Sequence, residues 1–186
     1  MVSLTALMGF LLFSGNVMTL PVRAMTSTAS LPSNYAVTLT AYNAVPAQTD
    51  GNPLETASGA FSNPEVVAAR SQDLADKLPF GTIIELEGSN ISSEHTCGYS
   101  VVAKSIGYRV IADAMNARYT DRIDILFNTK ANYTTTDKGM KNAAEILGIC
   151  KGITIRIVGH IDIRNIPKTQ TELAKIVVGK SGLALK

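Results

Sequence analysis

From Tyr35 onward, short runs of apolar residues alternate with polar ones, and Val, Ile and Thr are frequent in these runs. A period of two residues with this composition is typical of β-strands that bury one face. The pattern predicts strands at residues 35–43, 66–69, 82–87, 99–105, 108–113, 122–127 and 153–163.

One segment has the spacing of a helix instead. At residues 138–148, the apolar residues Met140, Ala144 and Leu147 share one face, and Gly148 suits the C-terminal cap. Short strands with long connections and one or two short helices predict a mainly β fold, a small closed barrel.

The length of 186 residues suits one domain of ordinary size with appendages. We expect the barrel domain at residues 35–163. It is preceded by an export signal or anchor at residues 1–24 and a polar linker at residues 25–34. A C-terminal tail at residues 164–186 follows and carries a short helical pattern at residues 171–178.

The first residues resemble an export signal. Residues 4–20 are apolar and uncharged, and residues 22–24 have the small-x-small pattern of a cleavage site, which predicts cleavage after Ala24. The alternative is an uncleaved membrane anchor. Either one predicts a location in the periplasm, the cell wall or the extracellular space. In an exported chain, Cys97 and Cys150 are expected to form a disulfide, with two buried free thiols as the alternative.

Composition removes several classes of partner. The net charge is only +2, so no electrostatic argument favours binding to nucleic acid or to anionic lipid. The two cysteines have no flanking ligands of a zinc site, and His95 and His160 stand alone, so we predict neither a metal nor a cofactor. Nothing in the sequence indicates an oligomeric state.

The acids of residues 110–127 are the candidate chemistry. Asp113 and Asp124 lie beside strand-forming apolar residues, and both reach one groove if their strands are neighbours. Close carboxylates with partial burial have raised pKa values, and an acid protonated near neutral pH can donate a proton to a glycosidic oxygen. A plainer alternative stays open, in which Asp113 caps a turn and Asp124 pairs with Arg118 or Arg122.

Three segments, in order, add a family resemblance. They are TAYNAVPAQTDGNPLETASG at residues 40–59, LPFGTIIEL at 78–86 and VIADAMNARYTDRIDILF at 110–127. Together they resemble the 3D domain, named for three aspartates and found in membrane-bound lytic transglycosylase A and in stationary-phase peptidoglycan-cleaving proteins. The three aspartates correspond to Asp50, Asp113 and Asp124.

The resemblance implies a six-stranded double-psi β-barrel. It also implies non-hydrolytic cleavage of the bond between N-acetylmuramic acid and N-acetylglucosamine in peptidoglycan glycan strands, with a 1,6-anhydro product. By the same resemblance, Asp124 is the general acid and then the base, Asp113 orients Asp124 and raises its pKa, and Asp50 braces the groove or binds sugar hydroxyls.

Further expectations concern the surrounding residues. Thr56 and Ser58 are candidate hydrogen-bond donors, and Asn116 is a candidate substrate contact. The chain departs from commoner relatives in having ADAMN where they have EDTGG, and in lacking a basic residue between TASG and Arg70. Two other functions stay open, a hydrolytic muramidase with Asp113 as the second carboxylate, and a non-catalytic wall-binding module on the same barrel.

Overall fold

A computed structural model of the chain describes residues 34–87, 97–136 and 139–183. The expected signal or anchor at residues 1–24, and the linker up to residue 33, lie outside these ranges. Among the helices that are described, none combines the length and the hydropathy needed to cross a membrane.

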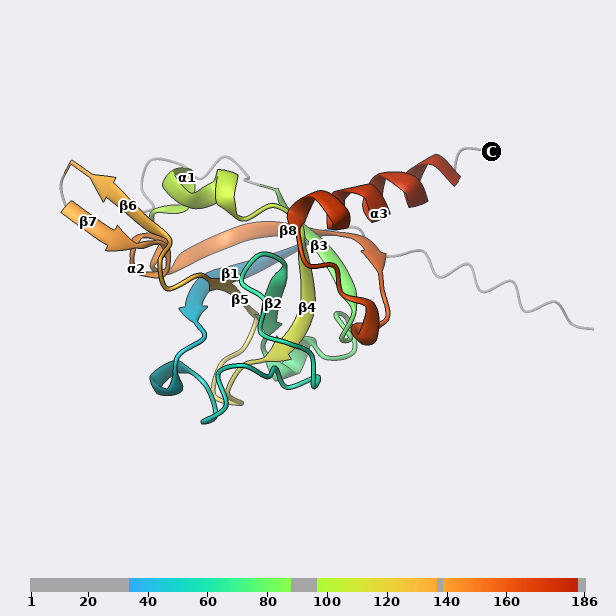
Figure 1. Ribbon diagram of the computed structural model, residues 1–186, viewed down its shortest axis with the longest axis horizontal. Helices are drawn as coiled ribbons and strands as arrows, with labels where there is room; N and C mark the ends of the chain where they lie inside the picture. Colours follow the sequence, from blue (N-terminus) through green and yellow to red (C-terminus); the bar gives the residue numbers. More distant parts are fainter. Residues whose placement is uncertain (1–33, 88–96, 137–138, 184–186) are drawn as a thin grey trace, which may run out of the picture. The chain divides into compact units, whose positions relative to one another are not determined.

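Strands dominate the described part of the chain (Figure 1). The strands are β1 (Asn34–Asn43), β2 (Val67–Arg70), β3 (Thr82–Glu87), β4 (Arg109–Ala114), β5 (Arg122–Phe127), β6 (Asn132–Thr135), β7 (Gly139–Asn142) and β8 (Cys150–His160). The helices are α1 (Tyr99–Val102), α2 (Ala143–Leu147) and α3 (Gln170–Leu183), with 3-10 turns η1 (Pro46–Gln48), η2 (Gln72–Leu74), η3 (Ala103–Ser105) and η4 (Ile163–Asn165).

Six strands close a barrel in the order β1-β5-β2-β4-β3-β8. The neighbours β1 and β5 are parallel, as are β2 and β4, and the other four pairs are antiparallel. Exchanging β1, β2 and β3 with β4, β5 and β8 reproduces the same neighbours and the same directions. In this internal two-fold repeat, each parallel pair joins a strand of one half to a strand of the other. This is the topology of a double-psi barrel, so the predicted fold class is confirmed.

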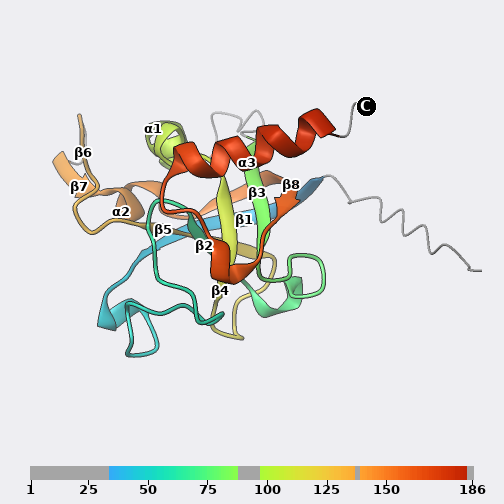
Figure 2. The same ribbon diagram turned by 45° about the vertical axis from the view of Figure 1, so that its right-hand side comes forward.

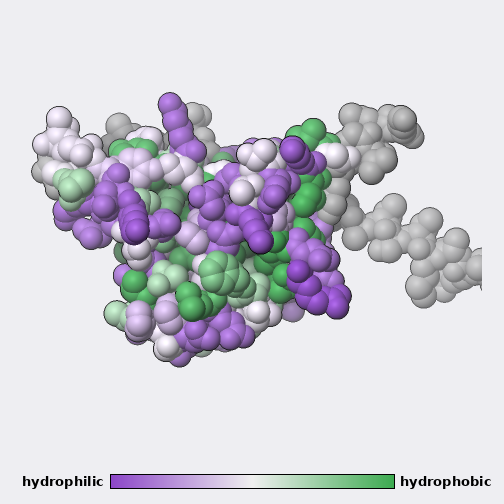
Figure 3. Space-filling view, in the orientation of Figure 1, coloured by the Kyte–Doolittle hydropathy of each residue, from purple (hydrophilic) through white to green (hydrophobic). Residues whose placement is uncertain are grey.

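Two apolar clusters hold the barrel together. One draws buried residues from all six barrel strands, and it therefore fills the interior. The other joins Val67 and Val110 to Leu173 and Val177 of α3, which lies along one side of the barrel in both views (Figure 1, Figure 2). On the face shown in Figure 3, hydrophobic and hydrophilic side chains are interspersed, because most of the large apolar side chains lie in these clusters.

The strand predicted at residues 99–105 is wrong, since this segment forms α1 and η3. Its β-branched residues favour a strand, but tertiary contacts override that preference. Gly98 donates its N–H to the Leu147 carbonyl at 3.1 Å, which docks the start of α1 on α2. A Cβ at Gly98 would lie 2.1 Å from the Ile146 carbonyl oxygen, so only glycine permits this approach.

The helix predicted at residues 138–148 is correct only in its second half. The described first half, β7, pairs with β6 in a hairpin that projects from the barrel (Figure 1). The helix begins after Asn142, whose side chain accepts a hydrogen bond from the Ala144 N–H. Gly148 forms the C-terminal cap, as predicted, but Met140 is exposed on β7 and shares no helix face.

A disulfide joins Cys97 to Cys150 across a sequence separation of 53 residues, with the two Cα atoms 5.3 Å apart. It ties the start of α1 to the start of β8. In the chain-entropy view, closing a loop of this length stabilises the fold by about 4 kcal/mol.

Candidate active site

A groove of about 940 Å³ opens beside the strands β1, β5, β2 and β4. Its walls are the connection from β1 to β2, the ends of these strands and the turn between β4 and β5. Five of the six residues predicted for the site line it, and they are Asp50, Thr56, Asp113, Asn116 and Asp124. Ser58 does not.

Strand register places the two central aspartates on either side of Ala69. Within the sheet, Ala69 of β2 pairs with Asp113 of β4 on one side and with Asp124 of β5 on the other. Residues paired in register project from the same face, so both carboxyl groups face the groove. Two strand spacings, roughly 10 Å, separate the two backbones. Between the two aspartates, β2 contributes only the methyl group of Ala69.

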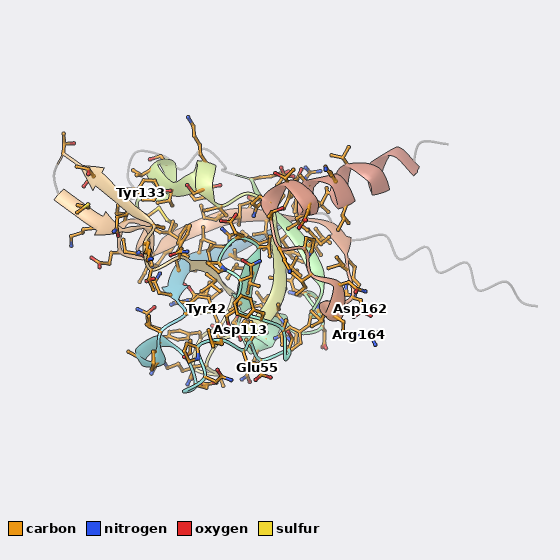
Figure 4. All side chains as sticks on the ribbon, in the orientation of Figure 1. Tyr42, Glu55, Asp113, Tyr133, Asp162 and Arg164 are labelled. Atoms are coloured by element: carbon orange, nitrogen blue, oxygen red, sulfur yellow. A yellow bond between two sulfur atoms is a disulfide. The ribbon has the colours of Figure 1, made fainter. Side chains whose placement is uncertain are left out.

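Asp113 is fully engaged by its neighbours. Its Oδ2 accepts a hydrogen bond from the Tyr42 hydroxyl at 2.7 Å, and its Oδ1 accepts from the N–H groups of Ala57 at 2.8 Å and Ala114 at 2.9 Å. Figure 4 shows Tyr42 and Asp113 side by side, with Glu55 on the neighbouring loop. Burial, and next the adjacent Asp113, raise the pKa of Tyr42 far above its ordinary value, so the hydroxyl remains a donor.

Asp124 has the opposite environment. Its Oδ1 is buried and has no hydrogen-bond partner among the described residues. Burial raises the pKa of Asp124 from 3.8 to about 6, against the lowering effects of the Thr40 hydroxyl and the Arg122 charge. The negative charge of Asp113 raises this pKa too, but it is the smallest of these causes. Desolvation, rather than the expected carboxylate pair, therefore dominates.

Buried polar atoms without a partner gather at this one place. Within the described ranges, the buried side-chain atoms that lack a hydrogen bond are Thr40 Oγ1, Arg122 Nε and Asp124 Oδ1. Thr40 is the register partner of Asp124 on β1, and Arg122 lies two residues before Asp124 on the same face of β5. The Thr40 hydroxyl lies close enough to lower the pKa of Asp124, although it falls short of hydrogen-bond geometry. Such groups are rare in folded proteins and each requires an explanation.

The turn between β4 and β5 contributes a basic and aromatic wall that was not among the predicted site residues. Arg118 and Tyr119 line the groove. The guanidinium carbons of Arg118 and Arg122 lie 4.8 Å and 4.7 Å from the centre of the Tyr119 ring, and Arg118 Nη2 donates to the Tyr119 hydroxyl at 2.9 Å. The pattern Arg-Tyr-x-x-Arg, ending two residues before Asp124, was the signal available in the sequence.

The other predicted site residues lie at the margin of the groove or stabilise the loops around it. Asp50 is exposed on the groove margin, and Asn116 is exposed and accepts the Arg118 N–H at 3.1 Å. Thr56 is only 5% exposed, and its hydroxyl bonds Ser58 and Ala60 to shape the loop. The donor that this loop presents to Asp113 is the backbone N–H of Ala57, which no side-chain pattern could reveal.

A second pocket of about 460 Å³ lies between β3, α1 and α3. Among the described residues that line it, the carboxylate is Glu85, which is paired with Arg156 and is not comparable to Asp124. In the part of the chain that the structure describes, no cluster of His, Cys, Asp and Glu side chains is arranged to hold a metal. Comparison with protein-family models, with curated proteins and with solved structures gave no match.

Proposed function

We propose that this protein is an exported peptidoglycan lytic transglycosylase of the 3D-domain type, with Asp124 as its proton-transfer group. The observation that carries the proposal is the Asp124 carboxyl itself. It lines an open groove, one of its oxygens has no partner among the described residues, and burial raises its pKa to about 6. A carboxyl group with these properties is suited to protonate a glycosidic oxygen near neutral pH.

The reaction needs only this one carboxyl. Asp124 gives its proton to the glycosidic oxygen while the bond from that oxygen to C1 of the muramoyl residue breaks. The 6-hydroxyl oxygen of the same residue bonds to C1, and its proton passes to the Asp124 carboxylate. The product is a 1,6-anhydro sugar and no water is consumed. Because the nucleophile is held in the same sugar, proximity replaces a positioned water.

The surroundings of Asp124 fit both halves of this cycle. Burial favours the protonated form before the bond breaks, and the nearby charge of Arg122 favours the carboxylate afterwards. The Thr40 hydroxyl, which has no partner in the described structure, lies beside the same carboxyl and can orient it.

The state of Asp113 favours a transglycosylase over a hydrolase. A hydrolase needs a second carboxylate that activates a water or attacks the sugar. Both oxygens of Asp113 already accept hydrogen bonds, three in total, from Tyr42, Ala57 and Ala114. Asp113 therefore holds the loop at Ala57 in place, and it supplies a fixed negative charge that stabilises the developing positive charge on the sugar ring.

Digestion of purified peptidoglycan with mass analysis of the products tests the proposal. We expect muropeptides that are one water lighter than the products of a hydrolase. Products with ordinary reducing ends would replace the transglycosylase with a hydrolytic muramidase. Binding to the wall without release of fragments would leave a non-catalytic module.

A further inference from the structure

We propose that Arg118, held by Tyr119 in the turn between β4 and β5, recognises a carboxylate on the glycan beside the cleaved bond, and that this sets the substrate preference. The inference rests on the proposed function, because it assigns a ligand to the same groove. It concerns a part of the groove that the proton transfer does not use, namely the guanidinium of Arg118.

The charge of Arg118 is available to a ligand. Within the described ranges, the ion pairs involve Lys141, Arg156 and Arg164, and neither Arg118 nor Arg122 takes part in one. Arg118 is exposed and lines the groove. A guanidinium in this position, with no carboxylate paired to it among the described residues, is free to bind an anion.

Hydrogen bonds hold the Arg118 side chain and its turn in place. Arg118 donates from Nη2 to the Tyr119 hydroxyl at 2.9 Å, and its backbone N–H donates to Asn116 Oδ1 at 3.1 Å. The Tyr119 N–H in turn donates to the Asn116 carbonyl at 3.0 Å, which closes the turn. The side chain is therefore held before a ligand arrives, so less conformational entropy is lost on binding.

The two sides of the groove carry charges of opposite sign. Asp50 and Glu55 lie on the opposite connection, and they would repel an anion there. Among the described residues that line the groove, Arg118 in the turn between β4 and β5 is the cation, so we expect an anionic group to bind at that wall. A guanidinium binds a carboxylate through two parallel hydrogen bonds, with a defined direction as well as an attraction.

The ligand chemistry follows from the proposed substrate. In a strand of alternating N-acetylglucosamine and N-acetylmuramic acid, the carboxylates belong to the muramoyl residues. They are the lactyl carboxylate where no peptide is attached, and the carboxylates of the stem peptide where one is. Both sources present the same group to Arg118, and an experiment must separate them.

The experiment measures binding of soluble glycan strands to the full chain carrying Asp124→Asn, which prevents turnover. Three ligands are compared, namely strands with stem peptides, strands stripped of peptides by an amidase, and stripped strands whose carboxylates have been converted to amides. We expect the stripped strands to bind at least about tenfold more tightly than their amidated form, as for a hydrogen-bonded charge. Adding Arg118→Gln should remove that difference, and Arg118→Lys should restore part of it.

Arg164→Gln is the matched control. Arg164 is an exposed arginine that pairs with Asp162 away from the groove lining, as Figure 4 shows for the two labelled side chains. It should leave all three affinities unchanged. If only the peptide-bearing strands lose affinity with Arg118→Gln, the carboxylate comes from the stem peptide and the proposal holds for that source. Equal binding of stripped and amidated strands, together with no effect of Arg118→Gln on any ligand, would overturn it.

The same proteins separate this inference from the proposed function. If the carboxylate preference depends on Arg118 but the chain without Asp124→Asn cleaves none of the strands, the transglycosylase proposal fails and the recognition site stands. If the unsubstituted chain cleaves strands to anhydro products, but Arg118→Gln changes the binding of none of the three ligands, the transglycosylase proposal stands and the recognition site fails.

Discussion

The two walls of the groove that meet at Ala69 differ in how completely their polar groups are satisfied. On the β4 wall, Asp113 accepts three hydrogen bonds, and each donor comes from a different part of the chain. On the β5 wall, buried atoms of Thr40, Arg122 and Asp124 lack partners within the described structure. The polar groups around Asp113 therefore stabilise the fold, and the unpartnered groups around Asp124 destabilise it.

This difference indicates a division of labour between two residues of the same type. A carboxylate that accepts several hydrogen bonds is held in one orientation, which suits a scaffold. A carboxyl that is buried without partners has a pKa closer to neutral, which suits proton transfer. If the two walls differ as their contacts indicate, substitutions on them should have different effects on cleavage and on stability.

The largest expected effect is the loss of glycan cleavage in Asp124→Asn. General acid catalysis contributes on the order of 10²–10⁴-fold, and the amide cannot donate a proton in its place. The rate of release of anhydro fragments measures this. In the unsubstituted chain, kcat/KM should fall above about pH 6, because the pKa of Asp124 is raised to about 6 and only the protonated form is the acid.

Asp121→Asn is the control for that variant. Asp121 is an exposed aspartate three residues earlier, and its φ of 49° is one that asparagine tolerates well. Its cleavage rate should match that of the unsubstituted chain. Cleavage by Asp124→Asn at the normal rate would contradict the assignment of the acid.

The next effect is on the β4 wall. Asp113→Ala leaves the Tyr42 hydroxyl and the N–H groups of Ala57 and Ala114 without their acceptor. Since each lost hydrogen bond costs about 1 kcal/mol, we expect the free energy of unfolding to fall by about 3 kcal/mol. Asp113→Asn keeps an acceptor for the two N–H groups and should lose much less. Denaturant titration measures both, and equal losses would contradict the geometric role.

Much of this arrangement follows from the sequence. The alternation around Ile123 and Ile125 predicts a strand that buries one face, which places Asp124 on the other face together with Arg122. The turn at residues 79–82, which leads into β3, also has a clear local cause. Gly81 has a φ of 93°, and a Cβ there would lie 2.1 Å from the Ile161 carbonyl oxygen.

What the sequence could not predict depends on contacts between distant segments. The strand between the two aspartates is β2, and only parallel pairing over more than 40 residues brings Ala69 beside Asp113. The donor from the loop is a backbone N–H at Ala57, while the predicted side chains of Thr56 and Ser58 stabilise the loop itself. Arg118 lies in the local turn between β4 and β5, and only the packing of distant segments makes this turn one wall of a groove.

At the β5 wall, we expect substitution of Asp124 to raise the free energy of unfolding, by less than Asp113→Ala lowers it. The pKa of Asp124 is raised from 3.8 to about 6 in the folded chain, so loss of its proton opposes folding. This cost is absent below about pH 3.8 and complete above about pH 6. Since one pKa unit corresponds to 1.36 kcal/mol, its upper limit is about 3 kcal/mol.

Asp124→Asn resembles the protonated acid and removes this cost. The variant should therefore be more stable than the unsubstituted chain at pH 7.5, by about 2 kcal/mol, and the difference should vanish at pH 3.5. Thermal unfolding at the two pH values measures this. A variant that is less stable at pH 7.5 would show that the carboxylate is satisfied in the folded chain.

The smallest effect is expected for Tyr42→Phe. Removing the hydroxyl takes one of three donors from Asp113 and leaves the ring in its cluster, so the free energy of unfolding should fall by about 1 kcal/mol. Tyr35→Phe on the same strand is the control, because the Tyr35 hydroxyl has no hydrogen bond within the described part of the chain. Cleavage should persist in Tyr42→Phe, since Ala57 and Ala114 still hold Asp113. If Tyr42→Phe abolished cleavage as Asp124→Asn does, the β4 wall would take part in proton transfer, and the contrast between the two walls would be lost.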